Sequence, residues 1–149
     1  MEAANRGAAD VKGGKSIGMG ISLPFETGLN PYVTPELAFE YHYFFTRKFW
    51  MAFHMQALVV APGGFGTMDE LFEVWTWYQL GIHSKPVGIL NVEGYFDGLI
   101  EYLHQMVTQE FLSQRHLDSL HISHSPFDLI SQMQVSEREL EAIWVADEK

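Results

Sequence analysis

A glycine-rich segment in the middle of the chain combines residue types that bind phosphate with residue types that do acid–base chemistry. The segment 62-PGGFGTMDE-70 contains, in order, Gly63, Gly64, Phe65, Gly66, Thr67, Asp69 and Glu70. Glycines permit positive φ and let a ligand approach the backbone closely. The N–H groups of a helix's first turn attract phosphate. The alternative interpretation is an ordinary turn, in which Thr67 caps a helix and the two acids interact with its dipole.

The flanking segments indicate a strand before this loop and a helix after it. The segment 56-QALVVA-61 contains the continuous apolar run 57-ALVVA-61, which is typical of a strand buried on both faces of a parallel sheet. A helix is predicted over 67–80, ending at Gly81. Ligands of open parallel sheets bind beyond the carboxyl ends of the strands. The position of the loop therefore favours a phosphate site.

The rest of the chain alternates between strand and helix patterns. Strands are predicted at 16–24, 36–43, 86–90 and 119–123, and helices at 2–11, 44–55, 95–110, 126–133 and 136–145. The helix over 95–110 has an apolar stripe of Leu99, Leu103, Met106, Val107 and Phe111. This alternation predicts an α/β fold, a Rossmann-like parallel sheet flanked by helices, in a single domain over residues 1–149.

Composition excludes several classes of protein. The chain of 149 residues has no cysteine, so disulfides and thiolate chemistry are excluded and a cytoplasmic location is favoured. A formal net charge of −10 argues against nucleic acid as a partner. No apolar run is long enough to span a membrane, so no membrane association is expected. His116, His121 and His124 lack the spacing of a zinc site, and no metal is predicted.

The segment 62-PGGFGTMDE-70 resembles the P-G-G-x-G-T-x-x-E signature of the Lonely Guy (LOG) family, often labelled lysine decarboxylases. The resemblance covers most of the chain and includes 1-MEAANRGA-8, 20-GISLPFE-26, 30-NPY-32, 44-FFTRK-48 and 70-ELFEVWTWYQLGIHSKPVGILNVEGYFDGL-99. It implies a homodimer without a cofactor. It also implies hydrolysis of the N-glycosidic bond of a purine nucleoside 5′-monophosphate, either a cytokinin riboside monophosphate or an AMP-like nucleotide, to free base and ribose 5-phosphate. No motif for a pyridoxal-dependent decarboxylase is present.

The same resemblance assigns roles to individual residues. Arg47 and Glu70 match the family's essential residues, and the loop from Gly63 to Thr67, Phe65 included, matches its phosphate- and ribose-binding segment. A carboxylate can stabilise oxocarbenium character at C1′ and activate water, and a guanidinium suits phosphate or ribose oxygens. Lys48 and Glu73 are further candidates. Glu73 lies three residues after Glu70 on the predicted helix and is expected beside it, ahead of Asp69.

The amino-terminal part of the pattern departs from the family. Members usually carry about two further strands and a second glycine-rich loop before the segment that matches 1-MEAANRGA-8. The sequence therefore predicts a Rossmann-like domain that lacks its amino-terminal strands. Two hypotheses follow: an active nucleotide hydrolase, or an inactive LOG-family fragment that only binds nucleotide or dimerises.

Overall fold

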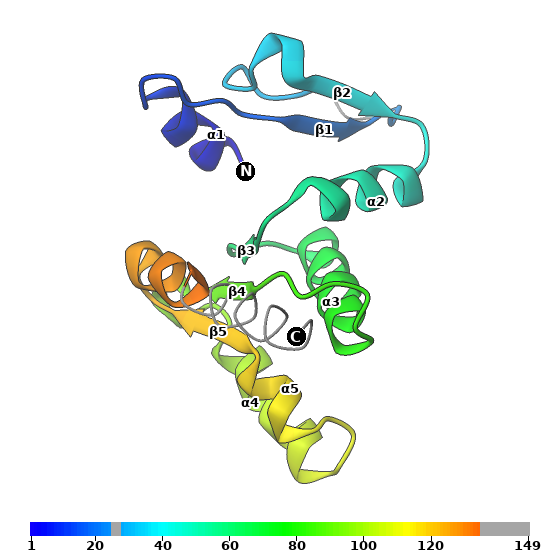
Figure 1. Ribbon diagram of the computed structural model, residues 1–149, viewed down its shortest axis with the longest axis vertical. Coiled ribbons are helices and arrows are strands. Elements are labelled where there is room, and N and C mark those ends of the chain that lie inside the picture. Colours follow the sequence, from blue (N-terminus) through cyan, green and yellow to red (C-terminus); the bar gives the residue numbers. More distant parts are fainter. Residues whose placement is uncertain (25–27, 135–149) are drawn as a thin grey trace, which may run out of the picture. The chain divides into compact units, whose positions relative to one another are not determined.

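The computed structural model describes residues 1–24 and 28–134, which fall into two compact units (Figure 1). Unit 1 comprises Met1–His54, and unit 2 begins at Met55. Both units are mixed α/β structures with parallel strands and flanking helices, as the sequence predicts. The single domain over 1–149 stays a prediction, and the helix predicted over 136–145 lies outside the described residues.

Unit 1 is a two-stranded parallel sheet with helices. Its elements are α1 (Glu2–Ala9), β1 (Gly18–Ile21), the 3-10 helix η1 (Pro35–Leu37), β2 (Ala38–Tyr41) and α2 (Phe44–His54). Strand β1 pairs with β2 so that Gly18 faces Ala38 and Ile21 faces Tyr41. Helix α2 follows β2 directly and contacts both strands. These elements confirm the predicted order, with η1 occupying the start of the strand predicted at 36–43.

Close packing explains why β1 begins with glycine. A Cβ atom on Gly18 would lie 2.7 Å from the side chain of Val33 and 2.8 Å from that of Leu29. Next to this contact, the backbone of Ser16 pairs with Thr34: its N–H donates to Thr34 Oγ1 at 2.9 Å, and its carbonyl accepts from Thr34 N–H at 2.9 Å. The loop before η1 is therefore fixed against the start of β1.

Unit 2 contains a three-stranded parallel sheet in the order β3-β4-β5. Its elements are β3 (Leu58–Val60), α3 (Phe65–Gln79), β4 (Val87–Leu90), the 3-10 helix η2 (Val92–Gly94), α4 (Asp97–Thr108), α5 (Gln114–Asp118) and β5 (Leu120–Ser123). Residues 126–134 are also helical. Every strand pair is parallel, so all three carboxyl ends lie at one edge of the sheet.

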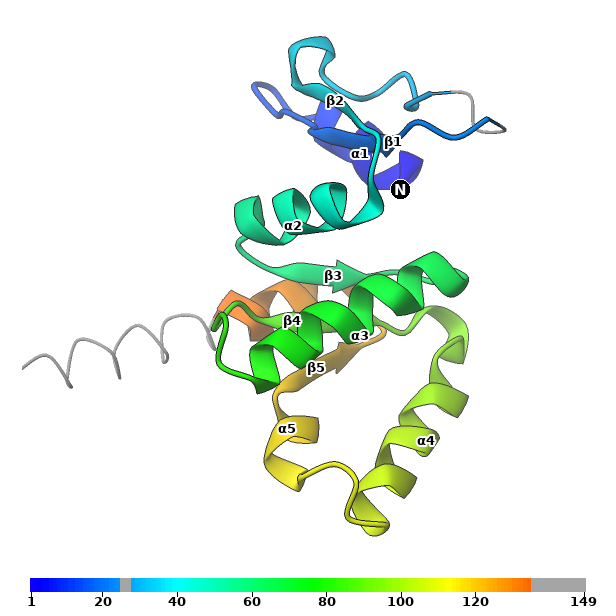
Figure 2. The same ribbon diagram turned by 90° about the vertical axis from the view of Figure 1, so that its right-hand side faces the viewer.

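Helices cover both faces of this sheet. Figure 2 shows α3 on one face and the helical residues 126–134 on the other. A Cβ atom on Gly88, in the central strand, would meet Met133 Sδ at 2.7 Å and Leu129 Cδ1 at 2.9 Å, so glycine lets this helix approach the sheet closely. Leu71 of α3 and Ile89 of β4 are fully buried. The core of unit 2 therefore lies around β4.

A Schellman motif ends α3. Gly81 has φ of 72°, its N–H donates to Tyr78 O at 3.0 Å, and the N–H of Ile82 donates to Trp77 O at 2.9 Å. Glycine is preferred at this position because it adopts positive φ without steric strain. The predicted helix end at Gly81 is confirmed.

Two expectations about burial are wrong. Strand β3 is not buried on both faces, since Val59 is 47% exposed in the part of the chain that the structure describes. The continuous burial expected there belongs to β4. In the stripe of α4, Leu103 is buried, but Phe111 lies beyond the end of the helix and is 79% exposed. The neighbouring Leu112 takes the buried position, because the chain turns away after Thr108.

Candidate active site

The glycine loop connects the carboxyl end of β3 to α3, as the sequence predicts, but the helix begins earlier than expected. Gly64 is the N-cap residue, and the N–H of Met68 donates to its carbonyl at 3.1 Å. Thr67 therefore lies within the first turn, and the prediction that it caps the helix is wrong. The N-cap has no side-chain hydrogen bond. Because Gly64 has no side chain, it cannot accept a hydrogen bond from the first-turn N–H groups of α3. These groups can therefore donate to an oxygen of a bound ligand.

The three glycines of the loop differ in the space that surrounds them. None of them has a positive φ, so the loop does not use the left-handed conformation that glycine permits. A Cβ atom on Gly63 would overlap the hydroxyl oxygen of Thr67 and lie 2.9 Å from its Cβ. At Gly64 and Gly66, a Cβ atom would meet no described atom within 4 Å. Gly63 is therefore required by internal packing, whereas Gly64 and Gly66 border open space.

The acids of 62-PGGFGTMDE-70 lie in the second turn of α3. No acidic residue lies in its first turn, so the interpretation of Asp69 and Glu70 as dipole-stabilising first-turn acids is wrong. Glu70 is half-buried. Phe65 begins the helix with 97% of its side chain exposed. Glu70 and the loop from Gly63 to Thr67 therefore belong to one continuous strand–loop–helix segment of unit 2.

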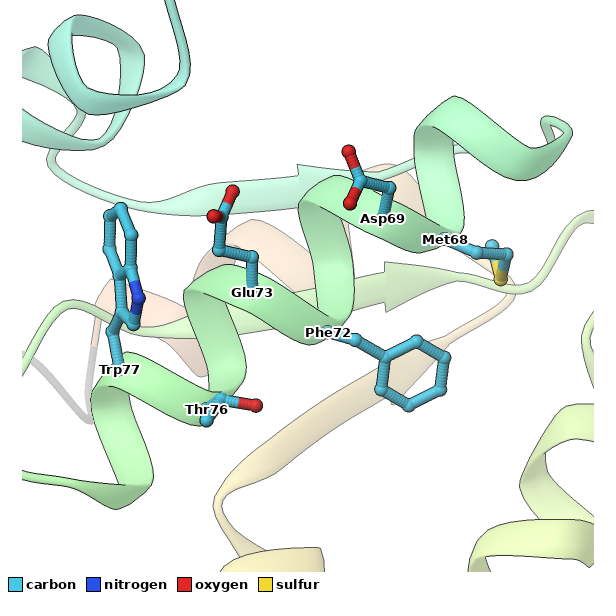
Figure 3. Close-up of a pocket in the computed structure, with 6 residues that line it drawn as sticks. All are labelled: Met68, Asp69, Phe72, Glu73, Thr76 and Trp77. Carbon is cyan, nitrogen blue, oxygen red and sulfur yellow. The ribbon is translucent and has the colours of Figure 1, made fainter. Parts of the chain in front are cut away.

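A groove of about 370 Å³ runs along α3 (Figure 3). The described residues that line it are Met68, Asp69, Phe72, Glu73, Thr76 and Trp77. The carboxyl groups of Asp69 and Glu73 project from the same side of the helix. Residues four apart are separated by only about 40° around a helix, whereas Glu70 and Glu73 are separated by about 60°. Glu73 therefore shares the groove with Asp69, and Glu70 is not among its described lining residues.

Arg47 lies on α2 of unit 1, next to Lys48, and both are half-buried. The Nε–H of Arg47 donates to the carbonyl oxygen of Met19 in β1 at 2.7 Å. This bond fixes the plane of the guanidinium relative to the sheet of unit 1. The structure thus describes Arg47 in unit 1 and Glu70 in unit 2, each by itself.

A hydrogen-bond network centred on Asn91 organises the carboxyl edge of the sheet of unit 2. Asn91 follows β4 and is 2% exposed. Its Nδ2 donates to Asp97 Oδ1 at 2.7 Å, and its Oδ1 accepts from the N–H of Phe96 at 2.8 Å. Its backbone N–H donates to Ser123 O at 2.8 Å, and His124 Nδ1 lies 2.6 Å from its carbonyl oxygen. The ends of β4 and β5 are therefore bonded to each other through the backbone of Asn91, and its side chain bonds the turn that leads into α4.

The glycine loop is bonded to the same edge through Tyr95. The hydroxyl of Tyr95, which follows η2, donates to the carbonyl oxygen of Gly63 at 2.9 Å. The side chain of Tyr95 is 58% exposed and that of Phe96 is buried. All three strand ends of the sheet are thus connected by hydrogen bonds.

Two histidines of unit 2 have lowered pKa values. Burial lowers the pKa of His83 from 6.5; the hydrogen bond with Val74 O opposes that change and the charge of Lys85 adds to it. Burial alone lowers the pKa of His121. Within residues 1–24 and 28–134, no group of three or more His, Asp or Glu side chains could hold a metal ion. None of the described helices is long and apolar enough to cross a membrane.

Comparison with known families agrees with the resemblance carried by 62-PGGFGTMDE-70. The sequence model of a family described as "possible lysine decarboxylase" matches residues 1–133. The chain belongs to this family. The match includes the glycine loop, Arg47 and Glu70.

Several relatives of the chain are plant proteins. Cytokinin riboside 5′-monophosphate phosphoribohydrolase LOG1 of Arabidopsis thaliana is 54% identical over 67 residues, which are 45% of this chain and 32% of LOG1. LOG7 of the same plant is 40% identical over 97 residues, which are 65% of this chain and 45% of LOG7. Probable LOGL6 of Oryza sativa subsp. japonica is 41% identical over 88 residues, covering 59% of this chain and 35% of LOGL6. The chain spans between about a third and a half of the length of these relatives.

Sequence reasoning missed the residues whose hydrogen bonds connect the carboxyl edge of the sheet of unit 2. Asn91, Tyr95 and Asp97 lie inside a segment that the family resemblance covers, but none was singled out. The signal that could have found them is local: an asparagine directly after a buried strand, followed by Gly94 and by an acid at the first position of a helix. Of the aromatic residues of α3, Trp75 is buried in the core and donates to Ser119 Oγ at 3.3 Å, whereas Trp77 lines the groove.

Proposed function

We propose that this chain hydrolyses the N-glycosidic bond of a purine nucleoside 5′-monophosphate, releasing the base and ribose 5-phosphate. The observation that carries the proposal is the strand–loop–helix segment with Glu70 directly after an uncapped, glycine-lined helix start. The names of LOG1 and LOG7, both cytokinin riboside 5′-monophosphate phosphoribohydrolases, support this reaction class.

Glu70 is the proposed catalytic carboxylate. As the C1′–N bond breaks, its electrons leave with the base and positive charge develops on C1′. A carboxylate close to that carbon stabilises the charge, and it accepts a proton from the water whose oxygen forms the new C1′–O bond. The base nitrogen takes up one proton, and Glu70 releases the proton that it accepted from the water, so that the base leaves as the neutral molecule, one water is consumed and Glu70 is again a carboxylate. Glu70 supplies the charge and the proton acceptor from a half-buried position, where electrostatic interactions are stronger than in bulk water.

The loop from Gly63 to Thr67 is the proposed phosphate and ribose subsite. Open space beside Gly64 and Gly66 lets an oxygen of the substrate approach their backbone. The first-turn N–H groups of α3 and the positive end of its dipole favour a dianionic phosphate there. Phe65 and Thr67, in the same turn, complete the proposed subsite.

Arg47 is the proposed clamp for phosphate or ribose oxygens of the same substrate. Its guanidinium stays charged at all working pH values and donates several hydrogen bonds in one plane. The bond from its Nε to Met19 O supports this role, because it limits the orientations of that plane. Lys48 is a secondary candidate, as a further positive charge near the phosphate. Glu73 is a second one, as an acid that lines the α3 groove.

The proposed assembly is a cytoplasmic homodimer that uses no cofactor. Support for a dimer comes from α2, where Phe45, Phe49 and Phe53 have 72%, 54% and 60% of their side chains exposed. Clustered exposed aromatic side chains are typical of an interaction surface. Phe49 stacks on Phe53 with ring centroids 6.0 Å apart, so they form one continuous apolar surface.

Release of free base from the purified 149-residue chain tests the function. The chain is incubated with adenosine monophosphate or its N6-isopentenyl analogue, and free base is quantified by chromatography. Glu70→Gln should lower the rate by roughly 10²- to 10⁴-fold, the usual contribution of acid–base catalysis. Glu101→Gln, at an exposed position of α4, is the matched control and should keep the wild-type rate.

The same assay separates the two hypotheses from sequence. Base release that depends on Glu70 supports the hydrolase. No release from either nucleotide, in a chain that still unfolds cooperatively, overturns the proposal and favours a LOG-family fragment that only binds nucleotide or dimerises.

A further inference from the structure

The contact between Tyr95 and the glycine loop fixes the orientation of one particular peptide. The Tyr95 hydroxyl donates to Gly63 O at 2.9 Å, between residues 32 positions apart in sequence. Among the described residues every peptide bond is trans, so the Gly63 C=O and the Gly64 N–H point in opposite directions. A bond that holds the carbonyl on one side therefore directs the Gly64 N–H to the other side.

This peptide lies between two glycines, so little else in the local sequence restrains it. Glycine adopts both signs of φ at little steric cost, and a Gly-Gly peptide can rotate by changing ψ of one residue and φ of the next. In the structure Gly64 has φ of −96° and ψ of −148° as the N-cap of α3. Packing of Gly63 against Thr67 restricts what fits beside the peptide, but this contact acts on the Cα of Gly63 and does not select one orientation of the peptide.

Tyr95 is itself held rigidly at its backbone. The N–H of the next residue, Phe96, donates to the buried side chain of Asn91 at 2.8 Å, and the ring of Phe96 is 2% exposed. Two residues before Tyr95, Glu93 has φ of 50°, a left-handed conformation that a residue other than glycine adopts only when its surroundings enforce it.

Gly94 continues this left-handed turn with φ of 74°. A Cβ atom there would lie 2.5 Å from Asp97 Oδ2, and the other carboxylate oxygen of Asp97 accepts from Asn91 Nδ2 at 2.7 Å. The turn that presents the Tyr95 hydroxyl is therefore determined by buried hydrogen bonds and close packing, although the hydroxyl itself is exposed.

We propose that Tyr95 is a positioning residue that holds the Gly63–Gly64 peptide so that the Gly64 N–H faces the 5′-phosphate of the substrate. The inference rests on the proposed function, because it takes the loop as the phosphate subsite. Tyr95 does not touch the substrate in this role; it acts through the peptide. Its loss lets the peptide rotate, and the phosphate then loses one backbone donor.

Tyr95→Phe tests this role because it removes only the hydroxyl. The expected result is a rise of roughly two- to tenfold in KM for adenosine monophosphate, with kcat nearly unchanged, corresponding to one hydrogen bond. Calorimetric titration with ribose 5-phosphate should show the same loss of affinity, whereas adenosine, which lacks phosphate, should bind to both proteins equally. Tyr102→Phe is the matched control: Tyr102, on α4, is 57% exposed, and its hydroxyl makes no hydrogen bond within the described part of the chain.

Outcomes that overturn the inference differ from outcomes that overturn the proposed function. Equal affinities of wild type and Tyr95→Phe for ribose 5-phosphate refute the positioning role. A loss of adenosine affinity in Tyr95→Phe as large as its loss of ribose 5-phosphate affinity also refutes that role. Absence of base release by wild type refutes the hydrolase, but the ribose 5-phosphate titration still tests Tyr95. A wild-type chain that does not bind ribose 5-phosphate at all refutes the phosphate subsite and with it the positioning role, while base release remains the test of the hydrolase.

Discussion

Alanine substitutions at Gly63 and Gly66 should have opposite effects on stability, although both lie in the same loop. An alanine methyl at residue 63 would overlap the Thr67 hydroxyl and lie 2.9 Å from Thr67 Cβ. Rotation about the side-chain torsion of Thr67 moves its hydroxyl but not its Cβ. The backbone of the loop or of the first turn of α3 must therefore move as well.

The size of the effect at residue 63 follows from this overlap. Inserting a methyl group into a packed site that cannot relax by a side-chain rotation costs about 1–3 kcal/mol of unfolding free energy. Gly66 is within α3, and a Cβ atom there would meet no described atom within 4 Å. Alanine is favoured over glycine in a helix by roughly 0.5–1 kcal/mol, so Gly66→Ala should be neutral or stabilising.

Urea unfolding followed by circular dichroism measures both variants. With an m-value of roughly 1–3 kcal/mol per molar urea, Gly63→Ala should lower the midpoint by about 1 M, whereas Gly66→Ala should leave it unchanged or raise it. A Gly63→Ala midpoint equal to wild type would refute the argument that Thr67 limits the size of residue 63. An equal fall for Gly66→Ala would refute the assignment of open space beside that residue.

Two further predictions concern the half-buried His83 and the arginine of unit 1. Burial lowers the pKa of His83 in the folded state from 6.5, so its contribution to stability is fully present above that pH and is lost as the pH falls below it. The urea midpoint of wild type should therefore fall more steeply than that of His83→Gln between pH 8 and pH 5, and parallel curves would contradict this. Arg47→Lys should lower kcat/KM for base release by about 10- to 100-fold, since lysine lacks the planar donors of the guanidinium. Arg115→Lys, at an exposed position of α5, is the control; an active Arg47→Lys would rule out the clamp.

Local patterns predicted the elements of the fold because each depends on residues close together in sequence. The strand at Val87–Leu90 and the end of α3 at Gly81 follow from an apolar run and from a glycine with positive φ. The start of α3 was misplaced because glycine disfavours helix, and the pattern therefore suggested a start after Gly66. The Met68–Gly64 hydrogen bond overrides that preference.

Local sequence patterns could not predict site residues whose role depends on contacts with residues far away in the sequence. Glu70 and Arg47 could be named because the signature and the resemblance single them out. Tyr95 could not, because its partner Gly63 lies in a different βα loop and meets it only when β3 and β4 are adjacent. Exposure of Val59 likewise depends on which elements cover the sheet, and a continuous apolar run carries no information about that.

The hydrogen bonds at the carboxyl edge of the sheet also determine when the glycine loop reaches its final conformation during folding. Gly63 and Tyr95 are 32 residues apart, and Asn91 and His124 are 33 apart. Contacts of such separation form only after the entropy of closing each chain segment has been overcome. During synthesis, the Gly63–Gly64 peptide acquires its bond only after β4 and η2 have emerged and docked, and Asn91 gains its last partner only with the residue after β5. The glycine loop is therefore translated early but reaches its final conformation late.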